Sequence, residues 1–281
     1  MPSLKSAMAL LSLFIFASAA QAAPGGLLLI GDSWADQQFN DQSHSMVFAA
    51  LGFGQVQVFG AATVESGSTA AEWAAPDRLA IIDQTLTDPA IEIVQLSVGG
   101  NDFLDAWNAD LDPPDQAALF ATIRADVETI VEFILASRPD VEVLLSFYDY
   151  PNFVDTLGGI IGGLFCAPLW NSMEQPTPLE LNTAAIALEQ SLLDMAEHPR
   201  VFHVSHFGQM QSLFGFPGMG IEPGDLQPPG DPAMPSPVAA LRFDGADCFH
   251  LSAEGYDQLV INQFEGYFET RFDVIFRSAF Q

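Results

Sequence analysis

The chain has 281 residues, of which 49% are apolar, so it is too hydrophobic for a disordered protein and long enough for one large domain. Acidic residues outnumber basic ones 36 to 8, which gives a formal net charge of −28. A surface this acidic repels phosphate groups, and this excludes nucleic acid and anionic lipid as partners.

The first 22 residues have the pattern of a secretory signal peptide. Lys5, the only lysine, supplies a positive charge, an apolar run follows over 7–20, and Ala20-Gln21-Ala22 is typical of a cleavage site. The run is short for a membrane span and has no charged stop after it. We therefore expect a secreted or periplasmic protein with no integral membrane segment after cleavage.

Strands and helices alternate along the rest of the chain. Short apolar runs predict strands over 26–30, 91–98, 141–147 and 200–204, and alternating polar and apolar residues predict one over 55–59. Helical spacing and capping signals predict helices over 42–51, 69–82, 114–137, 179–197 and 252–268. The alternation predicts an α/β fold, a flavodoxin-like three-layer sandwich whose mainly parallel sheet has about five strands.

Two segments do not follow this alternation. They span 150–178 and 207–244, and the second is rich in glycine and proline. Long irregular segments in a compact domain are usually functional or disordered. We expect a single domain over 23–281 that carries both segments as insertions.

Three short motifs lie where a parallel sheet places a site. Gly31-Asp32-Ser33-Trp34 follows the first strand, where a serine on a strand-to-helix turn exposes its hydroxyl beside backbone amides. Gly99-Gly100-Asn101-Asp102 follows the third strand and brings a side-chain amide to the same cleft. Asp247-Cys248-Phe249-His250 precedes the last helix, and its carboxylate is spaced to reach the histidine Nδ1. Each motif alone is also typical of an ordinary turn.

Taken together and in this order, the motifs resemble those of the GDSL esterase/lipase family, also called SGNH hydrolases. The resemblance covers residues 27 to about 268. Ser33 matches the family's serine block, Asn101 its Gly-x-Asn-Asp block, and Asp247 with His250 its Asp-x-x-His block. The resemblance implies the SGNH hydrolase fold and cleavage of carboxylic esters through a serine, with no metal and no cofactor.

Two parts of the family pattern are matched less well. The glycine block is assigned to Gly67, in a small-residue turn before a helix, and Gly60 is the alternative. Trp34 stands where the family has leucine. This difference leaves the shape of the pocket open, but it does not affect the expected chemistry. The extra length before His250 leaves the substrate class open.

The resemblance implies a secreted esterase or lipase that forms an acyl-enzyme on Ser33, with His250 as base and Asp247 orienting it. The amides of Ser33 and Gly67 and the side chain of Asn101 form the expected oxyanion hole. The expected substrate is a small-molecule or lipid ester, lysophospholipids included. Two alternatives stay open: a carbohydrate deacetylase of the same fold, and a catalytically inactive surface binding module.

The insertions contain apolar side chains that suit either an acyl pocket or lid, or a small satellite core. These side chains are Phe165, Trp170, Met210, Phe214, Phe216 and Met219.

The two cysteines, Cys166 and Cys248, are an even number in a chain expected to be exported, which predicts a disulfide between them. Metal binding is not expected. His203 and His206 fall on opposite faces of a strand, and the calcium-like run 108–112 has Pro113 where the loop requires glycine.

Overall fold

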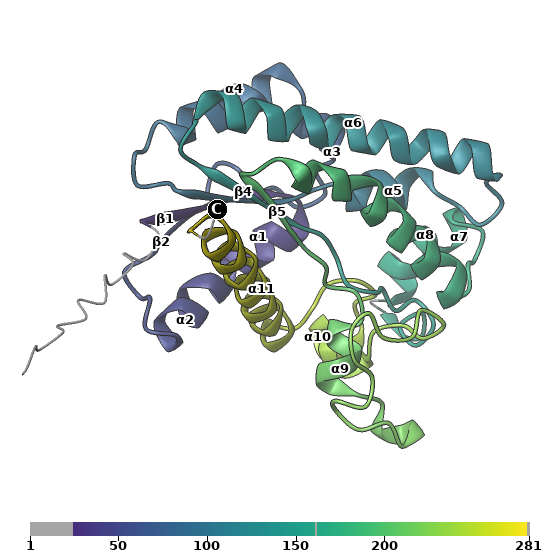
Figure 1. Ribbon diagram of the computed structural model, residues 1–281. Helices are drawn as coiled ribbons and strands as arrows, with labels where there is room; N and C mark the ends of the chain where they lie inside the picture. Colours follow the sequence, from purple (N-terminus) through teal and green to yellow (C-terminus); the bar gives the residue numbers. More distant parts are fainter. Residues whose placement is uncertain (1–24, 161, 280–281) are drawn as a thin grey trace, which may run out of the picture.

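The centre of the molecule is a parallel sheet with the strand order β2-β1-β3-β4-β5 (Figure 1). The computed structural model describes residues 25–160 and 162–279, so the predicted signal peptide over 1–22 lies outside the described residues. The strands are β1 (Gly26–Gly31), β2 (Gln57–Phe59), β3 (Ile93–Ser97), β4 (Glu142–Ser146) and β5 (Val201–Val204). This order is that of flavodoxin-like sheets, so the predicted fold class is confirmed.

Helices cover both faces of the sheet. In Figure 1, α3, α4, α6 and α8 lie on one face, and α1, α2 and α11 lie on the other. The longer helices are α1 (Ser33–Asn40), α2 (Ser43–Ala50), α4 (Pro76–Leu86), α6 (Pro113–Ser137), α8 (Pro178–Leu192) and α11 (Ala253–Ala279). The shorter ones are α3 (Ala70–Trp73), α5 (Gly100–Ala106), α7 (Ala167–Ser172), α9 (Gln209–Phe214) and α10 (Arg242–Gly245).

Strand β1 shows how the sequence divides its apolar residues between the two layers. Leu28 and Ile30 belong to the core under α4 and α6, whereas Leu27 and Leu29 belong to the core under α2 and α11. All four side chains are fully buried. A strand that is covered on both faces needs a continuous apolar run rather than an alternating one, and β1 has such a run.

The structure differs from the predicted elements where local signals compete. The helix expected over 69–82 is two helices, because Pro76 has no backbone N–H to continue α3 and instead begins α4. Helices α1 and α5 were not predicted, since both begin directly at the motif turns that the sequence indicated as loops. The first insertion contains a π-helix over Gly162–Cys166 followed by α7, and the second contains α9.

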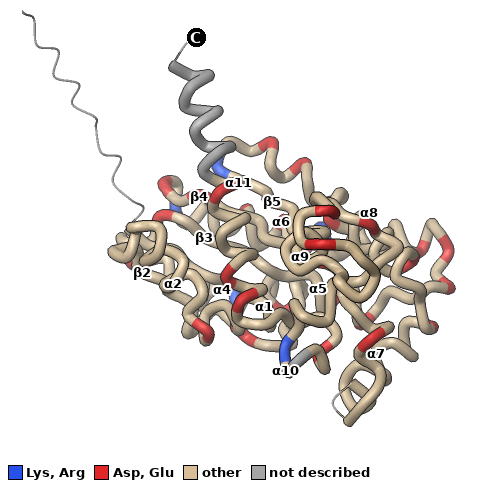
Figure 2. The backbone as a smooth tube through the Cα atoms, turned by 90° about the horizontal axis from the view of Figure 1, so that it is seen from below, with Lys and Arg blue, Asp and Glu red and all other residues tan. Residues whose placement is uncertain are grey.

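The few cations of the chain bind backbone carbonyls as well as carboxylates. Arg138 donates to the carbonyl oxygens of Leu86, Asp88 and Ile91, which ties the end of α6 to the end of α4 and the start of β3. Figure 2 shows the basic residues far apart and acidic residues spread over the surface of the described chain. No helix in the described ranges is both long and apolar enough to cross a bilayer.

The predicted disulfide is present. Cys166 and Cys248 are bonded across a separation of 82 residues, and their Cα atoms lie 5.9 Å apart. Both cysteines are buried. The bond joins the first insertion to the segment that carries Asp247 and His250, and the backbone N–H of Asn152 reinforces this junction by donating to the Cys248 carbonyl at 2.7 Å.

Reduction of this disulfide is expected to lower the free energy of unfolding by about 2–4 kcal/mol, because the bond restricts a long loop in the unfolded chain. Urea unfolding with and without reductant measures the difference. The double variant Cys166→Ala/Cys248→Ala is the matched control, since reductant must leave its midpoint unchanged. An equal midpoint for oxidised and reduced wild type would contradict the prediction.

Candidate active site

The site is built at the carboxyl end of β1, where three segments meet. The backbone N–H of Gly31 donates to Thr63 O at 2.9 Å, and that of Asp32 donates to Ser97 O at 3.1 Å. A side chain at Gly31 would place its Cβ only 2.1 Å from the Ser97 carbonyl oxygen, so only glycine fits this approach. Asp32 then caps α1, and Ser33 is the first residue of that helix.

Ser33, His250 and Asp247 form one chain of hydrogen bonds. The His250 Nε2 lies 2.8 Å from the Ser33 hydroxyl, and its Nδ1 lies 2.9 Å from Asp247 Oδ2. A carboxylate beside Nδ1 favours the tautomer with the proton on Nδ1, which leaves Nε2 free to accept from the serine hydroxyl. The three side chains predicted from the sequence are therefore brought together in the order that nucleophilic catalysis requires.

Asp247 is held by its own loop. Its Oδ1 accepts the backbone N–H groups of Phe249 at 3.0 Å and His250 at 2.9 Å, while Oδ2 faces the imidazole. Burial raises the pKa of Asp247, but the hydrogen bond and charge of His250 and these backbone donors lower it more. The net pKa lies below the usual value of an aspartate, so the carboxylate stays ionised.

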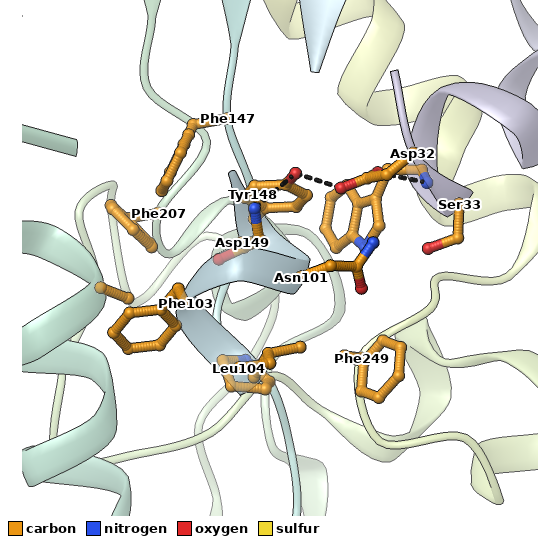
Figure 3. A pocket seen from close by; sticks show the side chains of 14 residues that line it. Asp32, Ser33, Asn101, Phe103, Leu104, Phe147, Tyr148, Asp149, Phe207 and Phe249 are labelled. Carbon is orange, nitrogen blue, oxygen red and sulfur yellow. Dashed lines mark hydrogen bonds between the residues drawn. The ribbon is translucent and has the colours of Figure 1, made fainter. Parts of the chain in front are cut away.

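The Asn101 segment is fastened to the loop that contains Gly67. The Asn101 Nδ2 donates to Ser68 O at 2.8 Å, and Asp102 accepts the backbone N–H groups of Ala70 and Ala71 at 2.7 and 3.3 Å. A side-chain amide has two N–H donors, so one remains for a ligand. Asn101 lines the same pocket as Ser33 (Figure 3).

Gly67 itself is exposed and is not among the residues that line that pocket. Its φ of +84° is in the left-handed region, where glycine is favoured. The alternative, Gly60, is buried, and a Cβ there would lie 2.6 Å from the Phe39 ring. Close packing against Phe39 explains why residue 60 is a glycine. Gly67 stays the better candidate for the family's glycine block, because it is adjacent to Ser68, whose carbonyl accepts a hydrogen bond from Asn101.

A second network was not predicted. Tyr148 follows β4, and its hydroxyl donates to Asp32 Oδ2 and accepts the backbone N–H of Gly100 at 3.0 Å. Asp32 Oδ1 accepts the Trp34 backbone N–H at 3.0 Å. This pair connects the serine turn to the start of α5, which carries Asn101. Only the position of Tyr148 just after a predicted strand could have indicated it.

The Asp32 carboxyl is fully enclosed in this network. Burial raises the pKa of Asp32 to about 6, although the hydrogen bond from Tyr148 lowers it. Burial and the neighbouring Asp32 charge together raise the pKa of the Tyr148 hydroxyl well above its usual value, so it stays a donor. The Trp34 ring packs edge-on against Tyr148, with centroids 5.2 Å apart.

An apolar pocket opens beside Ser33. Figure 3 shows Ser33 and Phe249 on one side of it and Phe103, Phe147 and Phe207 on the other. The remaining lining residues are Asp32, Trp34, Gly100, Asn101, Leu104, Tyr148, Asp149, Pro151 and Ala185.

Asp149 is the second buried carboxyl of the pocket wall, and burial raises its pKa to about 7. Its oxygens accept the backbone N–H groups of Tyr150, Gly208 and Met210, each at 2.7 Å. These donors partly oppose the effect of burial on its pKa. The carboxyl is thus occupied by the backbone of the second insertion and fixes where that insertion begins.

The apolar residues singled out in the insertions do not line this pocket. Met210 and Phe214 pack with Trp34 and Tyr256 in a separate small core, which supports the satellite-core interpretation for these two. Phe165 and Met219 are exposed. The aromatic wall comes instead from residues just after strands and in α5, which the sequence analysis did not assign to a pocket.

The histidine pair and the calcium-like run that the sequence contains both include residues with structural roles. His206 is buried against Ser146 and Asn262, and burial lowers its pKa to about 3. Asp112 caps α6 by accepting the Asp115 N–H at 3.0 Å. Within the described residues, no group of three or more acidic, histidine or cysteine side chains is arranged to hold a metal ion.

Comparison with known proteins supports the fold. No family model and no curated protein matches the sequence. A GDSL-like lipase from Bacteroides thetaiotaomicron superposes with a TM-score of 0.51 at 14% identity, covering 88% of this chain and 89% of the other. A Bacteroides fragilis protein named as an acylhydrolase gives 0.51 at 16% identity, covering 88% of both chains. The chain therefore has the fold of these proteins, as its motifs led us to expect.

The Asp32–Tyr148 pair is expected to stabilise the fold. Tyr148→Phe removes the side-chain O–H that Asp32 accepts and leaves the Gly100 N–H unpaired, so the free energy of unfolding should fall by about 1–3 kcal/mol. Tyr256→Phe is the matched control, because the Tyr256 ring also packs edge-on against Trp34 but its hydroxyl does not bond Asp32. Urea unfolding of both variants gives the comparison. Equal losses would contradict a specific role for the Tyr148 hydroxyl.

Proposed function

We propose that this protein is a serine carboxylic ester hydrolase of the GDSL/SGNH type. The observation that carries the proposal is the chain of hydrogen bonds from Asp247 through His250 to Ser33 at the edge of an apolar pocket. The names of proteins with the same fold, a GDSL-like lipase among them, agree with it.

Each residue has a distinct part in the proposed reaction. His250 Nε2 takes the proton of Ser33 as its oxygen attacks the ester carbonyl, and then returns the proton to the departing alcohol. Asp247 keeps the imidazole oriented and stabilises its protonated form. Water, activated by the same histidine, then hydrolyses the acyl-enzyme and releases the acid.

The oxyanion of the tetrahedral intermediate needs hydrogen-bond donors in place before it forms. We assign this role to the backbone N–H of Ser33, to the free N–H of the Asn101 amide and to the backbone N–H of Gly67. Asn101 is best supported, because it lines the pocket and its position is fixed by the bond to Ser68.

An exported enzyme fits the same set of observations. The disulfide between Cys166 and Cys248 is of the kind that persists in oxidising compartments. The apolar pocket lining supports an acyl substrate over the carbohydrate deacetylase alternative, since a sugar requires polar contacts. A binding module without catalysis has no use for an aligned serine, histidine and aspartate.

Ser33→Ala should remove ester hydrolysis almost completely, with a loss of about 10⁴–10⁶-fold in kcat. The change deletes one small hydroxyl, so the melting temperature should stay close to that of the wild type. Hydrolysis of p-nitrophenyl butyrate and thermal unfolding are measured on the same preparation. Near wild-type turnover in this variant would refute Ser33 as the nucleophile.

Asn101→Ala should lower kcat by about 10²–10³-fold and leave KM nearly unchanged, because its donor acts on a charge that exists only in the transition state. Asn40→Ala is the matched control, since Asn40 is an exposed helix residue outside the pocket. A lower melting temperature with unchanged kcat would show that Asn101 has only a structural role.

A further inference from the structure

We propose that the pocket beside Ser33 binds the acyl group and limits substrates to esters of short, uncharged, straight-chain carboxylic acids. This inference rests on the proposed ester hydrolysis and specifies its substrate class.

The pocket begins at the reacting groups. Ser33 and Asn101 both line it, so an ester carbonyl held between them directs its acyl chain along the apolar walls (Figure 3). Phe249 adjoins the base directly, because its ring centroid lies 4.4 Å from that of His250. A chain on the acyl side of the carbonyl therefore meets aromatic and aliphatic carbon rather than water.

The far wall is fixed by the core and cannot recede. Phe103, Phe147 and Phe207 are each at most 6% exposed. Phe103 stacks on Trp107 at 5.3 Å, and Phe207 stacks on Tyr150 at 5.0 Å. Close-packed interiors resist displacement of such rings, so this wall sets a limit on acyl length.

The space within the pocket is small, about 60 Å³. At roughly 10–15 Å³ for each water-sized group, this volume holds about four to six such groups. An acyl chain of about four to six carbons fills it. An aromatic acyl group does not fit, because a cavity that binds benzene has about 150 Å³.

The walls also discriminate by charge. The ionisable side chains among the lining residues are Asp32, Asp149 and Tyr148, and none of them can carry a positive charge. The carboxyl oxygens of Asp32 accept hydrogen bonds from the Tyr148 hydroxyl and the Trp34 backbone N–H. Those of Asp149 accept hydrogen bonds from backbone N–H groups. A carboxylate on the acyl chain would therefore find repulsion and no partner, which restricts the pocket to neutral chains.

The test measures kcat/KM for p-nitrophenyl acetate, butyrate, hexanoate, octanoate and dodecanoate. Burial of one methylene corresponds to about a fourfold gain, so kcat/KM should rise from acetate to butyrate or hexanoate. It should then fall at least tenfold by octanoate, because the longer chain no longer fits. An optimum at dodecanoate would overturn the proposal, because a chain of that length extends beyond the pocket.

Two variants of the pocket test the assignment of its walls. Ala185→Leu, on α8, fills the pocket and should lower the butyrate-to-acetate ratio of kcat/KM at least tenfold. Leu104→Ala removes carbon from a half-buried wall position and should move the optimum about two carbons longer. Thr183→Leu is the control, because Thr183 is an exposed residue of α8 outside the pocket, and it should change neither ratio nor optimum.

The outcomes separate this inference from the function on which it rests. Absence of any hydrolysis that depends on Ser33 would overturn both. Hydrolysis that depends on Ser33, with a ratio unaffected by Ala185→Leu, would leave the ester hydrolase standing and overturn the acyl pocket alone.

Discussion

The close approach of β1 to β3 at Gly31 is the constraint on which the rest of the site depends. The Gly31 carbonyl accepts the Glu65 N–H at 2.9 Å, and its N–H is bonded to Thr63, so the loop after β2 is attached to this same residue. One residue later, Asp32 is bonded to Ser97 of β3. The positions of Ser33, of the Gly67 turn and of the segment leading to Asn101 are therefore all fixed relative to one backbone contact. A parallel sheet makes this possible because all its carboxyl ends lie at one edge.

The histidine comes from far along the chain and is held by the two insertions. The disulfide and the bond from Asn152 to Cys248 attach its loop to the first insertion. On the other side, Leu241 and Leu251 form an antiparallel bridge, and Ser252 donates its N–H to Ala240 O at 2.8 Å. Both insertions thus act on the orientation of His250, and a general base has to lie within hydrogen-bond distance of the group whose proton it removes. Their extra length has a structural role at the site even though most of their apolar side chains lie outside the pocket.

Sequence patterns predicted the sheet and the chain of three polar side chains, but not the pocket. The strands were predictable because most are short apolar runs, two of them closed by glycine at Gly31 and Gly99, and the remaining one, over 55–59, alternates polar and apolar residues. The contact between Asp247 and His250 was predictable from their spacing, since a carboxylate three residues before a histidine on a tight loop can reach its imidazole. Tyr148 and Phe207 carry no such local signal. Each is an aromatic residue after a strand, and only packing between distant segments shows that one bonds Asp32 and the other closes a pocket.

The negative charge of the chain limits which groups can stabilise the oxyanion of the proposed reaction. A protein with a formal charge of −28 produces a negative potential that opposes a further negative charge on a bound substrate. Two carboxyls, Asp32 and Asp149, also line the pocket, and neither supplies positive charge to an oxyanion. Stabilisation of an oxyanion there cannot come from the overall field. It has to come from N–H dipoles within hydrogen-bond distance, and these act strongly because the apolar walls keep water and mobile ions away. The same field opposes the approach of anionic esters, which agrees with the neutral acyl group proposed above.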